Sequence, residues 1–216
     1  MKNINQYIEH TNLKPTITHY DIEQLISEAK EHQLFGVCVP PFWVKKAKRD
    51  IGDADIQLVT VIGFPLGYQM TEAKLAEIQK AIDDGADELD MVLNISALKA
   101  QMNWPKIEIA KCSKLAHEHY KLLKVIIETA YLTDQELELV CRWCADAGVD
   151  FVKTSTGFAP DGAKVEDITK MRALLPSNVG IKASGGIKTY EQAVKLISAG
   201  ADRIGTSSGV SIAQQL

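Results

Sequence analysis

Short apolar segments rich in Val and Ile alternate with longer amphipathic stretches along the whole chain of 216 residues. Eight such segments are predicted to be β-strands, at 6–11, 35–40, 57–63, 87–94, 122–129, 149–155, 179–184 and 202–208. Helical patterns lie between them, for example at 21–33, 71–85 and 189–200. In the second pattern Leu75, Ile78 and Ile82 fall on one face, as in an amphipathic helix. Because helical crossovers join parallel strands, this order predicts a parallel sheet.

The number of strands distinguishes two parallel folds. Eight strands over 216 residues leave about 27 residues for each strand and helix, close to the lower limit for a (β/α)8 barrel. An open doubly wound sheet is the alternative, but it usually has five or six strands, and no G-x-G-x-x-G follows the first predicted strand. We therefore predict an α/β fold, a (β/α)8 TIM barrel that forms a single domain over 1–216.

A short Gly-[Ala/Val]-Asp sequence recurs three times where a helical pattern passes into a predicted strand. Its glycines are Gly85, Gly148 and Gly200. Glycine directly after the last helical residue is a common helix stop, so these three positions are predicted helix ends.

Charge and hydropathy restrict the partners. Twenty-eight acidic and twenty-four basic residues give a formal charge of -4, which argues against a nucleic-acid partner. No segment approaches the roughly 18 apolar residues of a membrane helix, so we expect no membrane association. The first residues resemble neither a signal nor a transit peptide, and we expect a cytoplasmic protein.

Four cysteines in a chain of this length do not indicate a disulfide scaffold. Cys141 and Cys144 form a C-x-x-C inside a helical pattern, whereas redox pairs begin a helix and zinc sites need further ligands. We predict buried thiols at both positions and no metal site. Cys38, in an apolar strand, is predicted to be a core residue, although the strand end near Pro40 could bring it close to the pocket.

Three lysines interrupt predicted strands that are otherwise apolar: Lys124, Lys153 and Lys182. A buried ammonium without a partner is strongly disfavoured. The side chains could extend outward or pair with carboxylates. If all three point inward from successive strands, their ammonium groups approach one another.

Neighbouring ammonium groups have a chemical use. A free lysine, with a pKa near 10.4, is almost fully protonated at pH 7, but a nearby positive charge and desolvation can lower a lysine pKa to about 7. The neutral amine can then attack a carbonyl and form an imine. The lysine group therefore indicates Schiff-base chemistry, without identifying the lysine that attacks.

Asp90 is the matching carboxylate. Strand alternation places it with Glu88 and Val92 on one face of the segment 87–94. It could shuttle protons or form a salt bridge to a strand lysine, and the two roles are compatible.

The last three predicted strands end in small residues and glycine, at 154–157, 183–186 and 205–209. Backbone N–H groups in such loops can approach an anion closely. In barrels, phosphate often binds after strands 7 and 8, where Gly185, Gly186, Ser207 and Ser208 lie. Ordinary turn and capping chemistry is the alternative explanation for each loop.

Eight motifs along the chain resemble those of deoxyribose-phosphate aldolases. They are IEHTNLKP, GVCVPP, TVIGFPLG, GADELDMVLNISALK, LLKVIIET, DFVKTSTGF, KASGGIKTYE and RIGTSSGV. The family is a class I aldolase family with a (β/α)8 fold. The resemblance implies reversible cleavage of 2-deoxy-D-ribose 5-phosphate to acetaldehyde and D-glyceraldehyde 3-phosphate, in deoxyribose phosphate catabolism. It implies no cofactor.

The resemblance also implies roles for individual residues. Lys153 would form the Schiff base, Lys182 would adjust its reactivity, and Asp90 would relay protons. Further substrate or phosphate-binding positions implied by the motifs are Thr11, Lys124, Gly157, Gly185, Gly186, Gly205, Ser207 and Ser208.

Two positions depart from the family pattern. Glu9 stands where Asp is common, and Lys188 stands where Arg is frequent. Lysine keeps the charge but loses the planar fork of arginine, so weaker phosphate binding is expected.

We expect a phosphorylated sugar as the ligand and a homo-oligomer, a dimer or a tetramer, as the assembly. Two alternatives remain open at this stage. One is a related Schiff-base aldolase with a different aldehyde pair, and the other is a non-catalytic phosphosugar-binding barrel.

Overall fold

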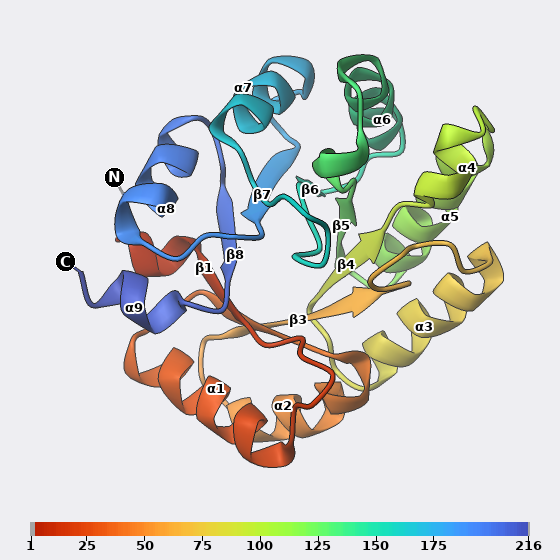
Figure 1. The fold of residues 1–216 in the computed structure, drawn as a ribbon. Helices are drawn as coiled ribbons and strands as arrows, with labels where there is room; N and C mark the ends of the chain where they lie inside the picture. The colour runs from red at the N-terminus through yellow and green to blue at the C-terminus, as the bar shows by residue number, and fades with distance from the viewer. Residues whose placement is uncertain (1–2, 216) are drawn as a thin grey trace.

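The computed structural model describes residues 3–215, which form a closed barrel of eight parallel strands (Figure 1). Each strand pairs with the next along the chain, and the last pairs with the first. The strands are β1 (Ile8–Thr11), β2 (Gly36–Val39), β3 (Gln57–Ile62), β4 (Glu88–Val92), β5 (Leu122–Ile126), β6 (Phe151–Lys153), β7 (Gly180–Ser184) and β8 (Arg203–Thr206). The predicted (β/α)8 fold and all eight predicted strands are confirmed.

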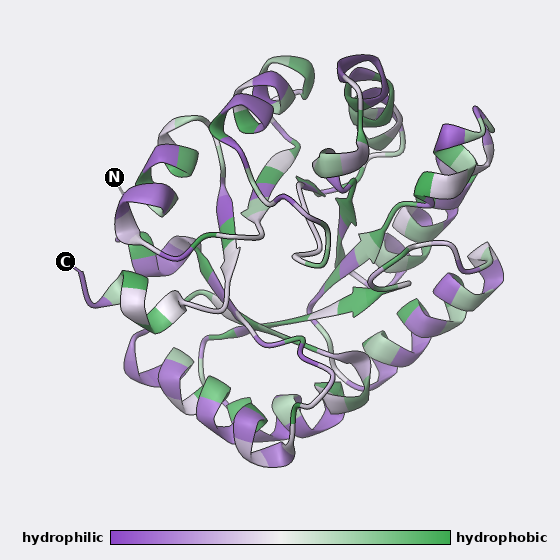
Figure 2. Ribbon diagram, viewed as in Figure 1, coloured by the Kyte–Doolittle hydropathy of each residue, from purple (hydrophilic) through white to green (hydrophobic). Residues whose placement is uncertain are grey.

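Helices surround the barrel (Figure 1). They are α1 (His19–Glu31), α2 (Val44–Ile51), α3 (Thr71–Asp83), α4 (Ile95–Lys99), α5 (Trp104–Glu118), α6 (Asp134–Asp146), α7 (Val165–Leu174), α8 (Tyr190–Ser198) and α9 (Gly209–Ala213). Short 3-10 helices are η1 (Ile4–Tyr7), η2 (Pro41–Trp43) and η3 (Thr129–Tyr131). Apolar helix faces turn toward the strands and polar faces turn outward (Figure 2). Within residues 3–215, no helix combines the length and apolar character needed to cross a membrane.

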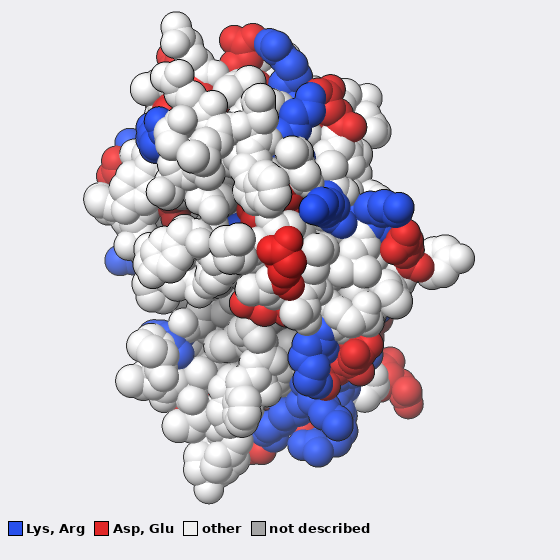
Figure 3. Space-filling model, turned by 90° about the vertical axis from the view of Figure 1, so that its right-hand side faces the viewer, with Lys and Arg blue, Asp and Glu red and all other residues white. Residues whose placement is uncertain are grey.

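Charges of both signs are mixed on the face of the molecule seen from the right of Figure 1, where Lys and Arg lie beside Asp and Glu (Figure 3). Ion pairs join neighbouring elements across the helical layer. For example, Lys99 of α4 lies 2.6 Å from Glu136 of α6. This face therefore has no continuous field of one sign.

Several strands end earlier than the apolar pattern predicts. The segment 122–129 leaves the β conformation after Ile126, because Glu128 adopts a left-handed backbone with φ 51°. The segment 149–155 forms a β-strand only from Phe151 to Lys153. In both cases the residues after the strand turn into loops at the carboxyl end of the barrel.

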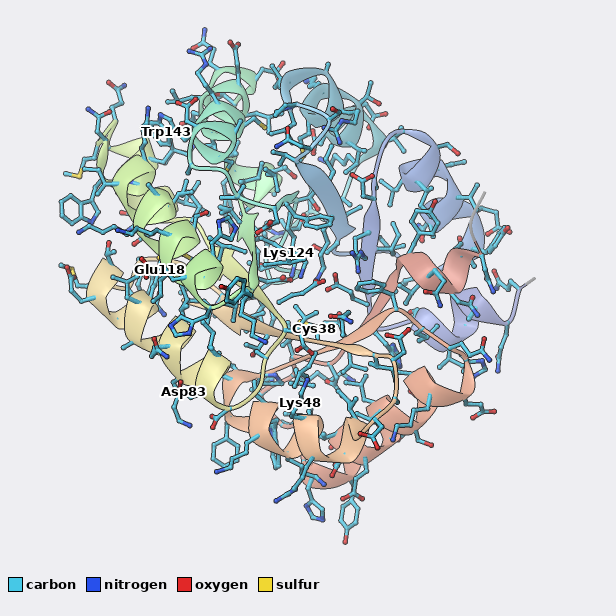
Figure 4. The ribbon with its side chains drawn as sticks, turned by 180° about the vertical axis from the view of Figure 1, so that it is seen from behind. Cys38, Lys48, Asp83, Glu118, Lys124 and Trp143 are labelled. Carbon is cyan, nitrogen blue, oxygen red and sulfur yellow. The ribbon has the colours of Figure 1, made fainter. Side chains whose placement is uncertain are left out.

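The interior of the barrel is divided into an apolar part and a charged part. Cys38, Val59 and Val61 of β2 and β3 form a small buried cluster, against which Leu13 and Phe64 pack. Charged side chains occupy the opposite part. The prediction that Cys38 is a core residue is confirmed, and burial raises the pKa of its thiol to about 11. Viewed from behind, Cys38 lies near the middle of the ring of strands, whereas Trp143 lies among the surrounding helices (Figure 4).

The recurring Gly-[Ala/Val]-Asp sequence joins adjacent strands at their amino ends. Its glycines follow helices and have positive φ angles of 100°, 66° and 118°, which confirms the predicted helix ends. Each aspartate accepts a hydrogen bond from a backbone N–H of the preceding strand. The pairs are Leu58 with Asp87 (3.0 Å), Leu123 with Asp150 (2.8 Å) and Ile181 with Asp202 (2.9 Å).

Cys141 and Cys144 are buried on α6 as free thiols. Burial raises the pKa of Cys141 to about 12 and also raises that of Cys144. The prediction of buried thiols at these two positions is confirmed.

Replacing Asp150 with Ala tests the repeated contact. The N–H of Leu123 loses its carboxylate acceptor, and we expect the free energy of unfolding to fall by about 1–3 kcal/mol. Asp146→Ala is the matched control, because Asp146 is half exposed and its side chain forms a surface pair with Lys106 at 3.2 Å. Its effect should stay within about 0.5 kcal/mol. Equal urea denaturation midpoints for the two variants would contradict this role of Asp150.

Candidate active site

A pocket of about 350 Å³ opens at the carboxyl ends of the strands, between the loops that follow β1, β6, β7 and β8. Lys153 lies in its wall. Six further residues predicted to bind the substrate or its phosphate also line it: Thr11, Gly157, Gly185, Gly186, Gly205 and Ser207. The structure thus brings most of the predicted positions together in one place.

Asp90 connects the three strand lysines beneath this pocket. Its Oδ2 accepts hydrogen bonds from Lys153 (2.8 Å) and Lys182 (2.7 Å), and its Oδ1 accepts one from Lys124 (2.9 Å). Of the directions left open for the lysines, the structure shows the inward one, with all three paired to Asp90. One carboxylate oxygen is shared by two ammonium groups, so a proton can pass between the lysines and Asp90 without a large movement.

Strand register explains this convergence. Asp90 pairs with Lys124 across β4 and β5, and Lys153 pairs with Lys182 across β6 and β7. Alternate residues of a strand point to the same side, so these positions all face the barrel axis. Seen from behind, Lys124 points toward the middle of the barrel (Figure 4).

The three lysines differ in their access to a ligand. Lys153 is 3% exposed and borders the pocket, whereas Lys124 and Lys182 are 0% exposed and lie outside its wall. Of the three, Lys153 is the amine that a small molecule in the pocket can reach. Residue-based reasoning alone did not distinguish the lysines.

Two more carboxylates belong to this buried group. Glu9 accepts a hydrogen bond from Lys182 and lies 3.6 Å from Lys124, which in turn is 2.5 Å from Glu88. Sequence reasoning did not assign either residue to the site. Glu9 could have been assigned from the sequence, because it lies two residues before Thr11 on the first strand and therefore on the same face.

Crowding of the three lysines was expected to lower their pKa values, but the neighbouring carboxylates have the opposite effect on Lys124 and Lys182. Burial would lower the pKa of Lys182, but Asp90 and Glu9 outweigh it and the pKa is raised. The pKa of Lys124 is raised for the same reason. Burial would raise the pKa of Asp90, but the three lysines hold it well below its usual range. The pKa of Glu9 is likewise lowered by Lys124 and Lys182 against the effect of burial.

The loops after β7 and β8 offer donors to an anion. The backbone N–H groups of Gly186 and Ser207 form no hydrogen bond to any residue within 3–215. Lys14 and Lys188 line the same pocket. Gly205 has a separate steric role, since a Cβ there would lie 2.9 Å from Cε of Lys182.

Two predicted binding residues lie outside the pocket wall. Lys124 is buried beneath it, and Ser208 precedes α9, with its N–H donating to Thr206 Oγ1 at 2.9 Å. Their binding roles remain predictions. His10 packs behind the site against α1, with Nε2 2.7 Å from Glu28.

A contact that sequence reasoning missed fixes the loop directly after Lys153. The Thr156 N–H lies 3.2 Å from both carboxylate oxygens of Glu128, and the Thr156 hydroxyl donates to the same carboxylate. Thr156 Oγ1 in turn accepts the N–H of Phe158 at 3.1 Å. Burial raises the pKa of Glu128, partly opposed by these hydrogen bonds. No spacing in the sequence indicated this pair.

Phe158 lies on the rim of the pocket and meets Phe64 edge to face, with ring centroids 5.4 Å apart. The aromatic pair connects the loop after β6 to the apolar part of the barrel. Within the described chain, no group of three or more His, Cys, Asp or Glu is arranged to hold a metal ion.

Thr156→Val tests the loop contact. Valine removes a hydroxyl that donates to Glu128 and accepts from Phe158, so we expect the free energy of unfolding to fall by about 1–3 kcal/mol. Thr156→Ser keeps the hydroxyl, so its free energy of unfolding should fall by much less. If the serine and valine variants unfold at the same denaturant concentration, the hydroxyl contacts do not account for the loss of stability.

Comparison with known proteins adds independent evidence. The family described as DeoC/LacD family aldolase matches residues 3–215. The deoxyribose-phosphate aldolase of Thermococcus gammatolerans is 52% identical over 214 residues, which cover 98% of this chain and 95% of the relative.

Solved structures agree with this match. The aldolase QR15 has a TM-score of 0.94 and 40% identity, and the alignment covers 100% of this chain and 96% of that one. A deoxyribose phosphate aldolase from Aeropyrum pernix, whose structure is described as a unique tetramer, has a TM-score of 0.92 and 35% identity. The alignment covers 98% of this chain and 90% of that one. The resemblance noted in the sequence is confirmed, and the chain is an enzyme that belongs to the DeoC/LacD family of aldolases.

Proposed function

We propose that the protein cleaves 2-deoxy-D-ribose 5-phosphate reversibly to acetaldehyde and D-glyceraldehyde 3-phosphate, through a Schiff base on Lys153. The observation that carries the proposal is the position of Lys153. Its amine borders the pocket and lies 2.8 Å from Asp90, while Lys182 and Lys124 lie below, out of reach of a ligand. The relatives named deoxyribose-phosphate aldolase support the choice of substrate.

The first step is attack of the Lys153 amine on the C1 aldehyde of the open-chain sugar. The resulting carbinolamine loses water and becomes a protonated imine. The C3 hydroxyl then gives up its proton, the C2–C3 bond breaks, and the electron pair of that bond moves into the imine. D-Glyceraldehyde 3-phosphate leaves, and an enamine remains on Lys153.

The enamine takes a proton at C2, and one water molecule hydrolyses the imine to acetaldehyde and the free amine. This water balances the one released on imine formation. Asp90 and Lys182 share a carboxylate oxygen with Lys153, so they can hold and return these protons, directly or through a water molecule. No metal or organic cofactor is required, because the protonated imine is itself the electron sink.

The phosphate of the substrate would bind at the other side of the pocket. The N–H groups of Gly186 and Ser207, which have no partner among residues 3–215, provide hydrogen-bond donors, and Lys14 and Lys188 provide positive charge. With the aldehyde at Lys153 and the phosphate at these loops, the reacting C2–C3 bond is held between them.

We further propose that the protein acts in the cytoplasm as a homo-oligomer. The tetrameric description of the Aeropyrum pernix relative supports an oligomer.

Lys153→Ala is expected to abolish cleavage of 2-deoxyribose 5-phosphate, since no other described lysine combines pocket access with contact to Asp90. Lys170→Ala, which changes a half-exposed lysine on α7, should keep close to full activity. The measurement is glyceraldehyde 3-phosphate release in a coupled assay, with ribose 5-phosphate and unphosphorylated deoxyribose as comparison substrates. Near wild-type activity of Lys153→Ala would refute the mechanism, and preference for another aldehyde pair would refute the substrate.

A further inference from the structure

The hydroxyl of Thr206, at the end of β8, joins the two loops that offer N–H groups to an anion. Its Oγ1 donates a hydrogen bond to the carbonyl of Ile187 (2.6 Å) and accepts one from the N–H of Ser208 (2.9 Å). Ile187 belongs to the loop after β7, and Ser208 belongs to the loop after β8. Thr206 itself is buried. One buried side chain therefore fixes the backbones of both loops relative to each other.

These two hydrogen bonds lie directly beside the unpaired N–H groups of the pocket. Ser207 stands between Thr206 and Ser208, and Gly186 immediately precedes Ile187. The N–H groups of Gly186 and Ser207 have no partner among residues 3–215, and both residues line the pocket. Backbone N–H groups bind an anion when they point into one concave site. Because Thr206 holds the neighbours of both donors, its hydroxyl determines where these N–H groups point.

The outer ends of the two loops are held by other contacts. Gly209 packs on the ring of His10, where a Cβ on the glycine would lie 2.8 Å from Nδ1. His10 is in turn fixed by Glu28, whose carboxylate lies 2.7 Å from Nε2. In the other loop, the N–H of Lys188 donates to Oε1 of Gln192 on α8 at 2.8 Å. Each loop is thus anchored at its outer end, and Thr206 connects the parts that face the pocket.

We propose that Thr206 is a positioning residue for the substrate phosphate: its hydroxyl holds the N–H groups of Gly186 and Ser207 in one anion site and so gives the enzyme its preference for a phosphorylated sugar. A hydroxyl has a single hydrogen to donate, and that of Thr206 is given to Ile187. Thr206 therefore acts through the two loops and not by donating to the phosphate. The inference rests on the proposed function, because it concerns the phosphate end of the same pocket.

Thr206→Val tests the inference. Valine has nearly the same shape, but it can neither donate to Ile187 nor accept from Ser208. We expect kcat/KM for 2-deoxyribose 5-phosphate to fall roughly tenfold, the factor for one lost hydrogen bond to a charged group. Most of the change should be in KM, because the phosphate is remote from the reacting bond. Unphosphorylated 2-deoxyribose does not reach the loops, so its kcat/KM should hardly change. Thr206→Ser keeps the hydroxyl and should restore the wild-type ratio of the two substrates.

Thr60→Val is the matched control. Thr60 is also buried, on β3, and its Oγ1 donates to the carbonyl of Val39 on the neighbouring strand at 2.8 Å. It does not line the pocket. The same chemical change should therefore cost stability at this position without altering the preference for the phosphorylated sugar. An equal loss of that preference in Thr60→Val and Thr206→Val would reveal a general effect of destabilisation and would contradict the role of Thr206.

Binding of inorganic phosphate gives a second measurement that does not depend on cleavage. In titration calorimetry, we expect the Kd of Thr206→Val for inorganic phosphate to be roughly tenfold higher than that of the wild-type protein. Thr60→Val and Thr206→Ser should bind phosphate as the wild-type protein does. If Thr206→Val does not fold, Thr206→Ala removes the same hydroxyl and takes its place in both measurements.

The two measurements distinguish failure of this inference from failure of the proposed function. Wild-type protein that cleaves neither sugar, but binds inorganic phosphate more tightly than Thr206→Val, would overturn the proposed function and support the anion site. Active wild-type protein whose preference for the phosphorylated sugar persists in Thr206→Val would overturn the inference alone. An unchanged affinity of Thr206→Val for inorganic phosphate would also overturn it.

Discussion

The carboxylate of Asp90, buried among three lysines, is the interaction on which the site depends. Burying an ammonium group is costly, and the barrel interior contains three of them, all 0–3% exposed. Asp90 makes this possible by bonding to Lys124, Lys153 and Lys182 with its two oxygens. The same geometry has a chemical consequence. One of its oxygens accepts hydrogen bonds from both Lys153 and Lys182, so the contact that compensates these buried charges also links the lysine beside the pocket to a second lysine.

The fold divides the barrel so that this network faces a pocket on one side only. The apolar cluster of Cys38, Val59 and Val61 fills the part formed by β2 and β3, where all three side chains are buried. At the floor, Arg203 of β8, which stacks on Phe35, closes the network from below. At the top, the loop after β6 is held by the Glu128–Thr156 contact close to Lys153. Burial, charge and access together single out Lys153 as the group exposed to a ligand.

The barrel fold and part of the site could be predicted from the sequence, because they depend on the periodicity of apolar residues along short segments. Strand and helix alternation predicted the barrel, and strand alternation placed Asp90 on a defined face of its strand. The inward direction of the lysines was left open. Glu9 and Glu88 were not assigned to the site, although Glu88 shares a strand face with Asp90, because no spacing in the sequence shows which carboxylate a lysine contacts. The Glu9–Lys182 bond, for example, spans 173 residues. The Glu128–Thr156 contact depends on a left-handed residue that ends β5 early, a turn that an apolar run does not indicate. Crowded lysines suggested depressed pKa values, but the structure adds the carboxylates that reverse this for Lys124 and Lys182.

Borohydride reduction in the presence of acetaldehyde, followed by peptide mass spectrometry, tests the central claim most directly. The reagent converts an imine to a stable ethyl group on the lysine that formed it. The account predicts one ethyl adduct, on the peptide that contains Lys153, and none on Lys124 or Lys182, which lie beneath the pocket. An adduct on Lys182, or no adduct on any strand lysine, would contradict it.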